Sequence, residues 1–392
     1  SSSTTGYGGA LAAKASQTLL SNSQLSTNSA NRGAGIYAIE GQLTMTGTQV
    51  LDNSTNGTQR RGGGIYLVSN SQSSIRNSII KGNSADTGAG IYLQDAVDFR
   101  ILNSKLVNNL QSVSSFSNGG GALYWNAGTS GLLANNLIAN NTAYQGGAAY
   151  GMSALEFVNN TIANNRAIYR GGAFYLNACS PTFQNSILWG NTAPSGGNQL
   201  WLQTNSSDPE ITYSDVQGGS AAFGLSTGSY TGLYQNNLNS PPLFVSPTAG
   251  VGINFNALEA DFSLQETSPC VETGDPATDC SGFPYDLAVF ARLSGTFIDM
   301  GAYEYQFPIL ALDVPQNVQI SLEGNVLVLS WDRVPYANSY RIFSSDDPFG
   351  TFLSEVPLSS GVLTLEGNRY FFRWQNYHPE MQFLYVMASS EP

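Results

Sequence analysis

The sequence is poor in the residues on which most enzyme and metal sites depend. It holds one histidine, three cysteines and only 15 basic residues in 392, against 27 acidic residues. The net charge of −12 disfavours nucleic acids and anionic membranes as partners, because both repel an acidic surface. The sequence contains no nucleophile motif, phosphate-binding loop or transition-metal cluster. No apolar run is long enough to cross a bilayer.

The few cysteines and the single histidine offer little chemistry. Cys270 and Cys280 are close enough along the chain to form a disulfide, which would suit an exported protein. Cys179 is expected to be a small buried apolar residue. His378, the only histidine, is expected at the surface. Because the chain begins at Ser1 without a leader, we expect a leader to have been removed from a precursor.

Asparagine, by contrast, recurs in a regular pattern. The repeated positions are Asn28, Asn53, Asn83, Asn109, Asn141, Asn165 and Asn191. An aliphatic residue lies three positions before each one, as Val50 does before Asn53. Identical Asn side chains stacked one repeat apart can hydrogen-bond amide to carbonyl, and Asn tolerates the left-handed backbone of a sharp corner. The pattern therefore predicts a structural asparagine ladder rather than a ligand site.

A cluster of small residues follows each of these asparagines. The clusters start at Gly8, Gly33, Gly62, Gly88, Gly119, Gly146, Gly171 and Gly196, so the steps between them are 25 to 31 residues. Short alternating runs such as Gly64-Ile65-Tyr66-Leu67 indicate strands. Strand units repeated at this period are typical of a solenoid. We predict an all-β chain that begins with a parallel β-helix of about eight or more coils, stacked about 4.8 Å apart.

Tyrosines recur four residues after the first glycine of a cluster, and we expect them on the outer face of the coils. They are Tyr37, Tyr66, Tyr92, Tyr150 and Tyr175, with Tyr124 displaced by one residue. Two interpretations are open. An exposed column of tyrosines would stack sugar rings or contact a neighbouring subunit, whereas a covered column would only support the fold.

Two families resemble parts of this chain. The unit Ile138-Ala-Asn-Asn-Thr-Ala-Tyr-Gln-Gly146-Gly-Ala resembles the repeat of the chlamydial polymorphic outer membrane proteins, with an aliphatic residue in place of the aromatic one. More broadly, residues 1–306 resemble bacterial secreted right-handed parallel β-helix proteins. Ser268-Pro-Cys-Val-Glu-Thr-Gly-Asp-Pro276 and Ile298-Asp-Met-Gly-Ala-Tyr-Glu304 look like the closing segment of such proteins. That resemblance implies that residues from about 205 to 306 finish the last coils and cap the column.

Residues 313–392 differ in character. Alternating strands such as Val326-Leu-Val-Leu-Ser-Trp331-Asp are spaced as in a β-sandwich. The set Trp331, Tyr340 and Tyr385 resembles a fibronectin type III domain. This resemblance implies a spacer, adhesion or attachment module.

The sequence assigns no catalytic residue. Asp95 and Asp98, with Arg100 nearby, are the best acidic cluster for polysaccharide chemistry, and a solvated face is the competing interpretation. Asp275 and Asp279, with Asp286, are weak candidates for Ca²⁺ ligands because this ion prefers oxygen ligands. An ordinary acidic turn is the alternative, and we expect no cofactor.

These observations predict an exported, non-enzymatic structural or adhesive protein, secreted or held at the cell surface. Its partners would be further copies, joined head to tail into fibres through open strand edges of the first coil, or a surface glycan or protein. Two alternatives remain. The chain could bind carbohydrate through the tyrosine column, or act as a polysaccharide lyase or hydrolase on a β-helix face.

Overall fold

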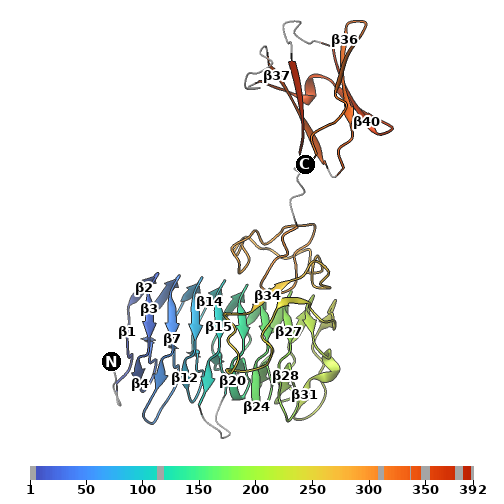
Figure 1. The fold of residues 1–392 in the computed structure, drawn as a ribbon. Coiled ribbons are helices and arrows are strands. Elements are labelled where there is room, and N and C mark those ends of the chain that lie inside the picture. Colours follow the sequence, from blue (N-terminus) through green and yellow to red (C-terminus); the bar gives the residue numbers. More distant parts are fainter. Residues whose placement is uncertain are drawn as a thin grey trace. The chain divides into compact units, whose positions relative to one another are not determined.

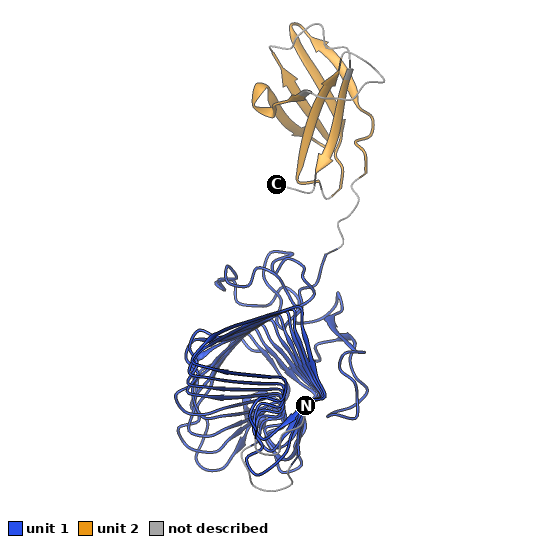
Figure 2. Cartoon of the chain, turned by 90° about the vertical axis from the view of Figure 1, so that its left-hand side faces the viewer, with its two compact units in different colours: residues 1–307 blue, residues 308–392 orange. Residues whose placement is uncertain are grey.

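The computed structural model describes residues 6–112, 119–307, 313–335, 337–345, 354–375 and 383–389. The chain divides into two compact units, Ser1–Phe307 and Pro308–Pro392. In the first unit, parallel strands stack coil upon coil (Figure 1), and a view turned by 90° shows the coils behind one another (Figure 2). The second unit consists of antiparallel strands.

The first six coils of the first unit each pass in turn through four parallel sheets, and the later described coils lack a strand of the fourth. Sheet 1 contains β1 (Leu11–Lys14), β5 (Ile36–Ile39), β9 (Ile65–Val68), β13 (Ile91–Gln94), β17 (Leu123–Trp125), β21 (Ala149–Gly151), β25 (Phe174–Leu176), β28 (Leu200–Leu202) and β31 (Gly224–Leu225). Sheet 2 contains β2 (Gln17–Ser21), β6 (Gln42–Thr46), β10 (Ser74–Arg76), β14 (Phe99–Leu102), β18 (Gly131–Ala134), β22 (Glu156–Val158), β26 (Thr182–Gln184), β29 (Glu210–Thr212) and β32 (Tyr234–Gln235).

The other two sheets are shorter. Sheet 3 contains β3 (Gln24–Ser26), β7 (Gln49–Leu51), β11 (Ile79–Lys81), β15 (Lys105–Val107), β19 (Leu137–Ala139), β23 (Thr161–Ala163), β27 (Ile187–Trp189) and β30 (Asp215–Val216). Sheet 4 contains β4 (Ser29–Ala30), β8 (Ser54–Thr55), β12 (Ser84–Ala85), β16 (Leu110–Gln111), β20 (Thr142–Gln145) and β24 (Arg166–Arg170). A short 3-10 helix, η1 (Ser220–Ala222), follows the last of the sheet 3 strands.

The register of the strands places equivalent residues of successive coils above one another. In sheet 1, Ile36 pairs with Ile65 and Ile65 with Ile91, and all three are fully buried. The aliphatic residue three positions before each ladder asparagine points inward from sheet 3, as Ile80 does. These side chains form one continuous apolar core along the solenoid. The predicted parallel β-helix is therefore confirmed.

A glycine with positive φ forms the corner before each of the first eight strands of sheet 1. Gly62 has φ +62°, and a Cβ atom there would lie 2.4 Å from the carbonyl oxygen of Ile65, so the corner requires glycine. In the coil that begins after the 31-residue step from Gly88, the corner residue is Gly120, with φ +87°, rather than the predicted Gly119. Tyr124 consequently pairs in register with Tyr92, and the predicted one-residue displacement of Tyr124 is wrong.

The predicted asparagine ladder is present at every step from Asn28 to Asn191. Each Nδ2 donates to the Oδ1 of the next ladder asparagine at 2.9–3.0 Å. The same Nδ2 also donates to a carbonyl of the preceding coil, as from Asn83 to Val50 at 2.9 Å. The Oδ1 accepts, in addition, the backbone N–H of the preceding ladder residue, as Asn83 does from Asn53 at 3.0 Å. The ladder thus satisfies buried polar groups on both neighbouring coils.

A second polar column lies five residues before the first, at the corner between sheets 2 and 3. Its members are Thr48, Ser78, Ser104, Asn136, Asn160, Ser186 and Ser214. Each one's backbone N–H donates to the side-chain oxygen of the next, as from Ser78 to Ser104 at 3.1 Å. The sequence does not reveal this column readily, because it contains both hydroxyl and amide residues.

The closing segment does not cap the end of the column. The coils continue to Gln235, and residues 240–306, which we call the strap, lie along the outer face of sheet 3. The strap contains the antiparallel pair β33 (Phe244–Ser246) and β34 (Asp261–Leu264). Its apolar residues Phe244, Phe262 and Met300 pack against Leu137, Ala163 and other outward residues of sheet 3. The implied terminal cap is therefore corrected to a lateral cover.

The outward residues of sheet 3 change type where the strap begins. On the first two strands they are mainly polar, as Gln24 and Gln49 are. On β19 and β27 the equivalent positions are the buried residues Leu137, Ala139 and Ile187. Burying apolar side chains on this outer face stabilises the strap by about 25 cal/mol per Å² of area removed from water.

The second unit has two antiparallel sheets around a shared apolar core that includes Trp331 and Tyr340. Sheet 5 has the order β35 (Gln319–Glu323), β36 (Val326–Asp332), β40 (Arg369–Trp374) and β39 (Val362–Glu366). Sheet 6 has the order β38 (Ser354–Val356), β37 (Ser339–Ser345) and β41 (Phe383–Ser389), and a 3-10 helix, η2 (Leu358–Ser360), follows β38. The third aromatic ring beside Trp331 and Tyr340 is Tyr370, whereas Tyr385 is 38% exposed.

The predicted disulfide is absent, because Cys270 and Cys280 are both free thiols. Cys270 belongs to the strap and is fully buried, and its thiol donates to Asp215 Oδ2 at 3.4 Å. Cys280 packs in a different cluster beside Phe283 and Leu132. Cys179 is buried as expected, and burial raises the pKa of its thiol to about 12.

We predict that replacing a ladder asparagine by alanine destabilises the solenoid. Asn83→Ala or Asn141→Ala removes a buried amide and leaves its partners on two coils unsatisfied, which should lower the free energy of unfolding by about 1–3 kcal/mol. Thermal or urea unfolding measures the loss. Asn254→Ala, at an exposed position outside the ladder, is the matched control and should unfold like the parent. Equal unfolding of ladder variants and control would contradict a stabilising ladder.

Candidate functional site

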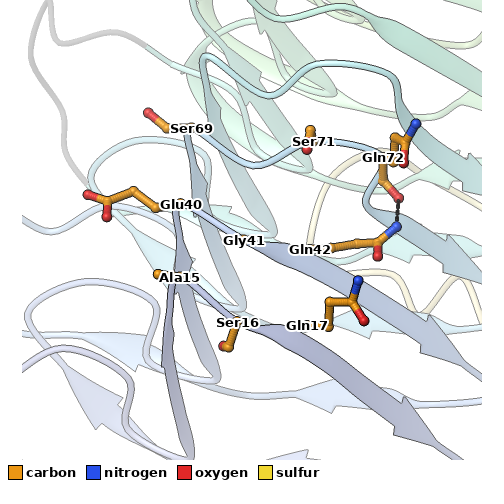
Figure 3. A pocket seen from close by; sticks show the side chains of 9 residues that line it. All are labelled: Ala15, Ser16, Gln17, Glu40, Gly41, Gln42, Ser69, Ser71 and Gln72. Carbon is orange, nitrogen blue, oxygen red and sulfur yellow. Dashed lines mark hydrogen bonds between the residues drawn. The ribbon is translucent and has the colours of Figure 1, made fainter.

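A polar groove lies at the corner between sheets 1 and 2 in the first three coils. It has a volume of about 330 Å³. Its lining forms three rows that run across the coils (Figure 3): Ala15, Glu40 and Ser69; Ser16, Gly41 and Ser71; Gln17, Gln42 and Gln72. The groove therefore offers amides, hydroxyls and one carboxylate, with no aromatic ring in its lining.

The corner backbone explains this composition. Ala15, Glu40, Ser69 and Gln72 all have φ near +50° to +58°, a left-handed conformation that turns the chain sharply. The strands on either side keep the rows in register, so Gln17 lies beside Gln42. Gln42 Nε2 donates to the carbonyl of Gln72 at 2.9 Å, which fixes its amide along the groove. The Glu40 carboxylate is only loosely held, 3.7 Å from Lys14 Nζ in an exposed pair.

The tyrosine column of sheet 1 is a continuous stack of parallel rings. The ring pairs run from Tyr7 through Tyr37, Tyr66, Tyr92, Tyr124 and Tyr150 to Tyr175, with centroids 4.9–5.6 Å apart. Trp201 lies next to Tyr175 in the strand register. Offset stacking of this kind adds about 0.5–1.5 kcal/mol per pair beyond the burial of area.

Arginines cover the column from the side. The Arg32 guanidinium lies 5.6 Å from the ring centroids of Tyr7 and Tyr66, and its Nη1 donates to the Tyr66 hydroxyl at 3.3 Å. Arg61 makes the same contact with the Tyr92 hydroxyl, and Arg170 lies 4.0 Å from the ring of Trp201. Burial raises the pKa of Tyr92 and of Tyr150 to about 12, so both hydroxyls stay protonated at neutral pH.

The column consequently supports the fold and leaves little ring surface for a ligand. Tyr66, Tyr92, Tyr150 and Tyr175 are only 3–6% exposed, and both faces of Tyr37 are covered by neighbouring rings. A sugar would need an open ring face to stack upon. The hypothesis of an exposed sugar platform at these five tyrosines is therefore wrong, and the covered alternative holds. The ring of Tyr7, at 47% exposed, is the most accessible member.

The acidic pair singled out in the sequence continues the corner of the groove into the fourth coil. Asp95 and Asp98 have φ of 50° and 53°, the conformation of Glu40 and Ser69 in the preceding coils. The Asp98 carboxylate forms an exposed ion pair with Arg100 at 3.3 Å. Asp95 lies over Gly128 of the next coil, where a Cβ atom would be 2.6 Å from Asp95 Oδ1. These contacts give both residues a structural role at the corner.

Two further carboxylates share the exposed face of sheet 2, although they lie far apart in the sequence. Glu156 and Glu210 both project from the exposed face of sheet 2, with Thr182 in register between them. Two strand spacings place their Cα atoms about 9.6 Å apart. Only the register shows this, since 54 residues separate them in sequence. They are the second acidic pair to test for hydrolysis.

The candidate Ca²⁺ ligands serve as turn and strap contacts. Asp275 accepts from Gln184 Nε2 at 2.7 Å and from the backbone N–H of Ala277. Asp279 accepts from the backbone N–H of Ser281 at 2.8 Å. Asp286 accepts three backbone N–H groups within the strap. Across the described ranges no three His, Cys, Asp or Glu side chains form a group that could hold a metal ion.

Two rows of corner asparagines hold the strap against the solenoid. Asn108, Asn140 and Asn164 donate to the carbonyls of residues 248–255 at the sheet 3–sheet 4 corner. At the opposite corner, Asn103, Asn135 and Asn159 donate to the carbonyls of residues 285 and 299, and Asn185 donates to Thr278 Oγ1 at 2.8 Å.

A signal for the strap does exist in the sequence. Three ladder asparagines under the strap are preceded by another asparagine, in Asn108-Asn109, Asn140-Asn141 and Asn164-Asn165, whereas Gly190 precedes Asn191. In earlier coils the preceding residue is Thr27, Asp52 or Gly82. The first residue of a doublet turns outward with positive φ and binds the strap, while the second points inward to the ladder.

A buried carboxyl anchors the end of the strap. Asp215 is fully buried, and it accepts from the backbone N–H of Ser240 at 3.2 Å and from the thiol of Cys270. Burial raises the pKa of Asp215 to about 6, and the two hydrogen bonds offset only part of this effect. The charged form of Asp215 is therefore unfavourable in the folded protein.

A second buried network closes the strap on itself. Arg292, 1% exposed, lies 3.3 Å from Glu304 Oε2 and donates to the carbonyl of Asp299 at 2.7 Å. Glu304 also accepts backbone N–H groups from Ser294 and Asp299. Burial raises the pKa of Glu304 to about 8 although Arg292 lowers it. Arg292 therefore links Asp299 and Glu304 inside the strap.

The single histidine of the chain, His378, lies outside the described residues, so its expected surface position stays a prediction. No helix in the described ranges is both long and apolar enough to cross a membrane.

Comparison with known proteins identifies the repeats. The sequence matches the family described as a right-handed beta helix region over residues 1–115 and 111–263. The match ends before the second unit, so the resemblance of that unit to fibronectin type III domains stays a prediction. Neither the curated proteins nor the solved structures contain a match to the chain.

We predict that Asp215→Asn stabilises the protein at alkaline pH. The pKa of Asp215 rises from 3.8 to about 6 on folding, so the folded state holds the proton more tightly. The contribution of Asp215 to stability is favourable below about pH 4 and is lost as the pH rises to 6, a change of about 3 kcal/mol. Asparagine removes the buried charge, so Asp215→Asn should exceed the parent in melting temperature at pH 8.

The same comparison at pH 4 supplies the control, since the parent carboxyl is then protonated in the folded state and the two proteins should differ little. A melting-temperature difference that is the same at pH 4 and pH 8 would contradict the buried charge as its cause.

Proposed function

The chain belongs to the family of right-handed β-helix proteins, and we propose that it is a non-enzymatic structural or adhesive protein, exported to the cell surface. The family fits a surface protein or a carbohydrate-active protein in general. The choice between the two depends on whether the repeated side chains of the column are open to a ligand or are used for contacts between coils.

The observation that carries the proposal is that each of the two long side-chain arrays of the column is satisfied by contacts among its own members rather than open to solvent. The asparagine ladder from Asn28 to Asn191 satisfies its amides between coils. The aromatic stack covers its own ring faces. Two acidic residues of the coils are held in ion pairs: Asp98 with Arg100, and Asp86 with Arg60 at 2.7 Å. Such a column favours a structural or adhesive role over catalysis.

Further copies of the chain and surface glycans are the proposed partners. The far end of the solenoid presents only short strand edges, which weighs against regular head-to-tail fibres. The outermost described strands β1, β2, β3 and β4 form one edge of all four sheets. At the other end, Phe223, Tyr230 and Tyr234 pack over the core, and the last strands are two residues long.

We predict that the full chain releases no product from polysaccharides. Neutral and uronate-containing polysaccharides are incubated with the protein, and new reducing ends and unsaturated uronates are measured. Product release that falls about a hundredfold in Asp95→Asn/Asp98→Asn or in Glu156→Gln/Glu210→Gln would overturn the non-enzymatic proposal, since this is the usual contribution of a general acid or base. Release that survives both double variants would also overturn it.

Glycan binding without chemistry is the second candidate, and the groove in Figure 3 favours it. The amides of Gln17, Gln42 and Gln72 recur once per coil along the groove, next to Ser16 and Ser71. Amides and hydroxyls in a row suit a ligand that carries hydroxyl groups along its length, such as a neutral oligosaccharide chain.

We predict that retention of the protein on a glycan array depends on this groove. Gln42→Ala and Glu40→Gln should each reduce retention, because they remove hydrogen-bonding groups from the lining. Gln24→Ala changes an exposed amide on sheet 3 of the same coil as Gln17 and should leave retention unchanged. Retention that persists in both groove variants, or that is lost equally in Gln24→Ala, would place any binding elsewhere.

A further inference from the structure

A cavity in the strap differs in its chemistry from the polar groove of the first coils. Its volume is about 400 Å³, which is in the range of small-molecule sites. Its lining comes from three segments of the strap: β34, residues 286–290 and residues 303–306. The lining includes the aromatic rings of Phe290, Tyr303 and Tyr305, whereas the lining of the groove contains no ring.

Hydrogen bonds within the strap hold this cavity in one arrangement. Asp286 Oδ1 accepts the backbone N–H groups of Ala288 and Phe290, at 2.9 and 2.8 Å, which fixes the turn that carries Phe290. Asp286 Oδ2 accepts the backbone N–H of Glu304 at 2.9 Å. One buried side chain thus joins the turn to residues 303–306 before any ligand binds.

Only one carboxylate of the lining is available to a ligand. The oxygens of Asp286 are occupied by backbone N–H groups, and Glu304 is paired with Arg292 at 3.3 Å. Asp261 is exposed, and its Oδ1 accepts the backbone N–H and the hydroxyl of Ser263, at 2.9 and 2.6 Å. Its Oδ2 has no partner among the described residues, so this oxygen can balance a positive charge in the cavity.

The negative charge extends to the aromatic part of the cavity. Burial raises the pKa of the Tyr303 hydroxyl, and the nearby carboxylates of Asp261 and Asp286 raise it further. The field that disfavours a phenolate favours a cation at the same place. An anion such as a uronate or a phosphate ester is repelled, because none of the described residues in the lining is basic.

We propose that this cavity binds a small molecule that carries a quaternary ammonium group, such as choline. Such a cation is attracted to the faces of aromatic rings and has no hydrogen to donate. Phe290, which is 53% exposed, and Tyr305 supply ring surface for its methyl groups, and Asp261 balances its charge. A primary ammonium carries three donors, and the single unpartnered carboxylate oxygen of the lining satisfies only one of them.

Titration of the full chain with choline, by calorimetry or ligand-observed NMR, tests the proposal. Binding should be saturable, with a dissociation constant in the millimolar range, because one small head group makes few contacts. The neutral isostere 3,3-dimethylbutanol, in which carbon replaces the nitrogen, should bind about tenfold more weakly. Phosphocholine, the form of the group found in lipids, should also bind more weakly than choline, because its phosphate is repelled.

Variants with matched controls locate the site. Phe290→Ala removes a ring and Asp261→Asn removes the charge, so each should weaken choline binding about threefold or more. Phe297→Ala changes another exposed ring of the strap, outside the cavity. Asp279→Asn changes another exposed carboxylate that accepts the backbone N–H of a serine two residues later. Both controls should bind choline like the parent, and thermal unfolding checks that all four variants are folded.

The comparison of ligands on the parent does not depend on how the variants fold. A parent without saturable choline binding would overturn the proposal, and so would equal affinity for choline and its neutral isostere. Equal or tighter binding of phosphocholine would contradict the repulsion of anions on which the choice of ligand rests. Undiminished binding in either cavity variant, or the same loss in its control, would also overturn the site.

Discussion

The rest of this structure depends on one constraint, that buried amide groups are satisfied by the neighbouring coil. Each ladder asparagine hydrogen-bonds to residues of both adjacent coils, so no coil is stable alone. The number of residues between successive ladder positions varies from 24 to 32, but the bond length stays at 2.9–3.0 Å. Additional residues are accommodated at corners, as between Asn53 and Asn83, and the inner geometry is unaffected.

The same asparagine chemistry serves both the inside and the outside of the column. In the doublet Asn140-Asn141, the second residue continues the ladder and the first binds the strap through carbonyls of Gly250 and Gly252. Positive φ at Asn140 makes this possible, because it turns the two successive side chains to opposite sides of the wall. A local backbone conformation thus couples the repeat to a segment more than 100 residues away.

How far the sequence predicted the structure depended on the range of the contacts. The ladder was predictable because Asn53 and Asn83 recur at one place in a repeat, and recurrence implies stacking. The face of the tyrosines was predictable for the same reason, but their burial was not, because Arg32 and Arg61 approach from the next corner. The strap has no periodicity, and its anchors join Asn103 to Tyr285, 182 residues apart. Alternation and spacing contain no information about such a contact. For the same reason, a disulfide with Cys280 was predicted for Cys270, whereas its thiol donates to Asp215.

The strap also divides the repeats into two classes with different freedom to change in number. A repeat duplicated or lost before Asn103 would lengthen or shorten the column and leave every strap contact in place. The same event between Asn103 and Asn185 would shift the anchors by one coil, about 4.8 Å, relative to a segment of constant length. The number of repeats before Asn103 can therefore change without moving the strap anchors, whereas the strap fixes the number of coils between Asn103 and Asn185.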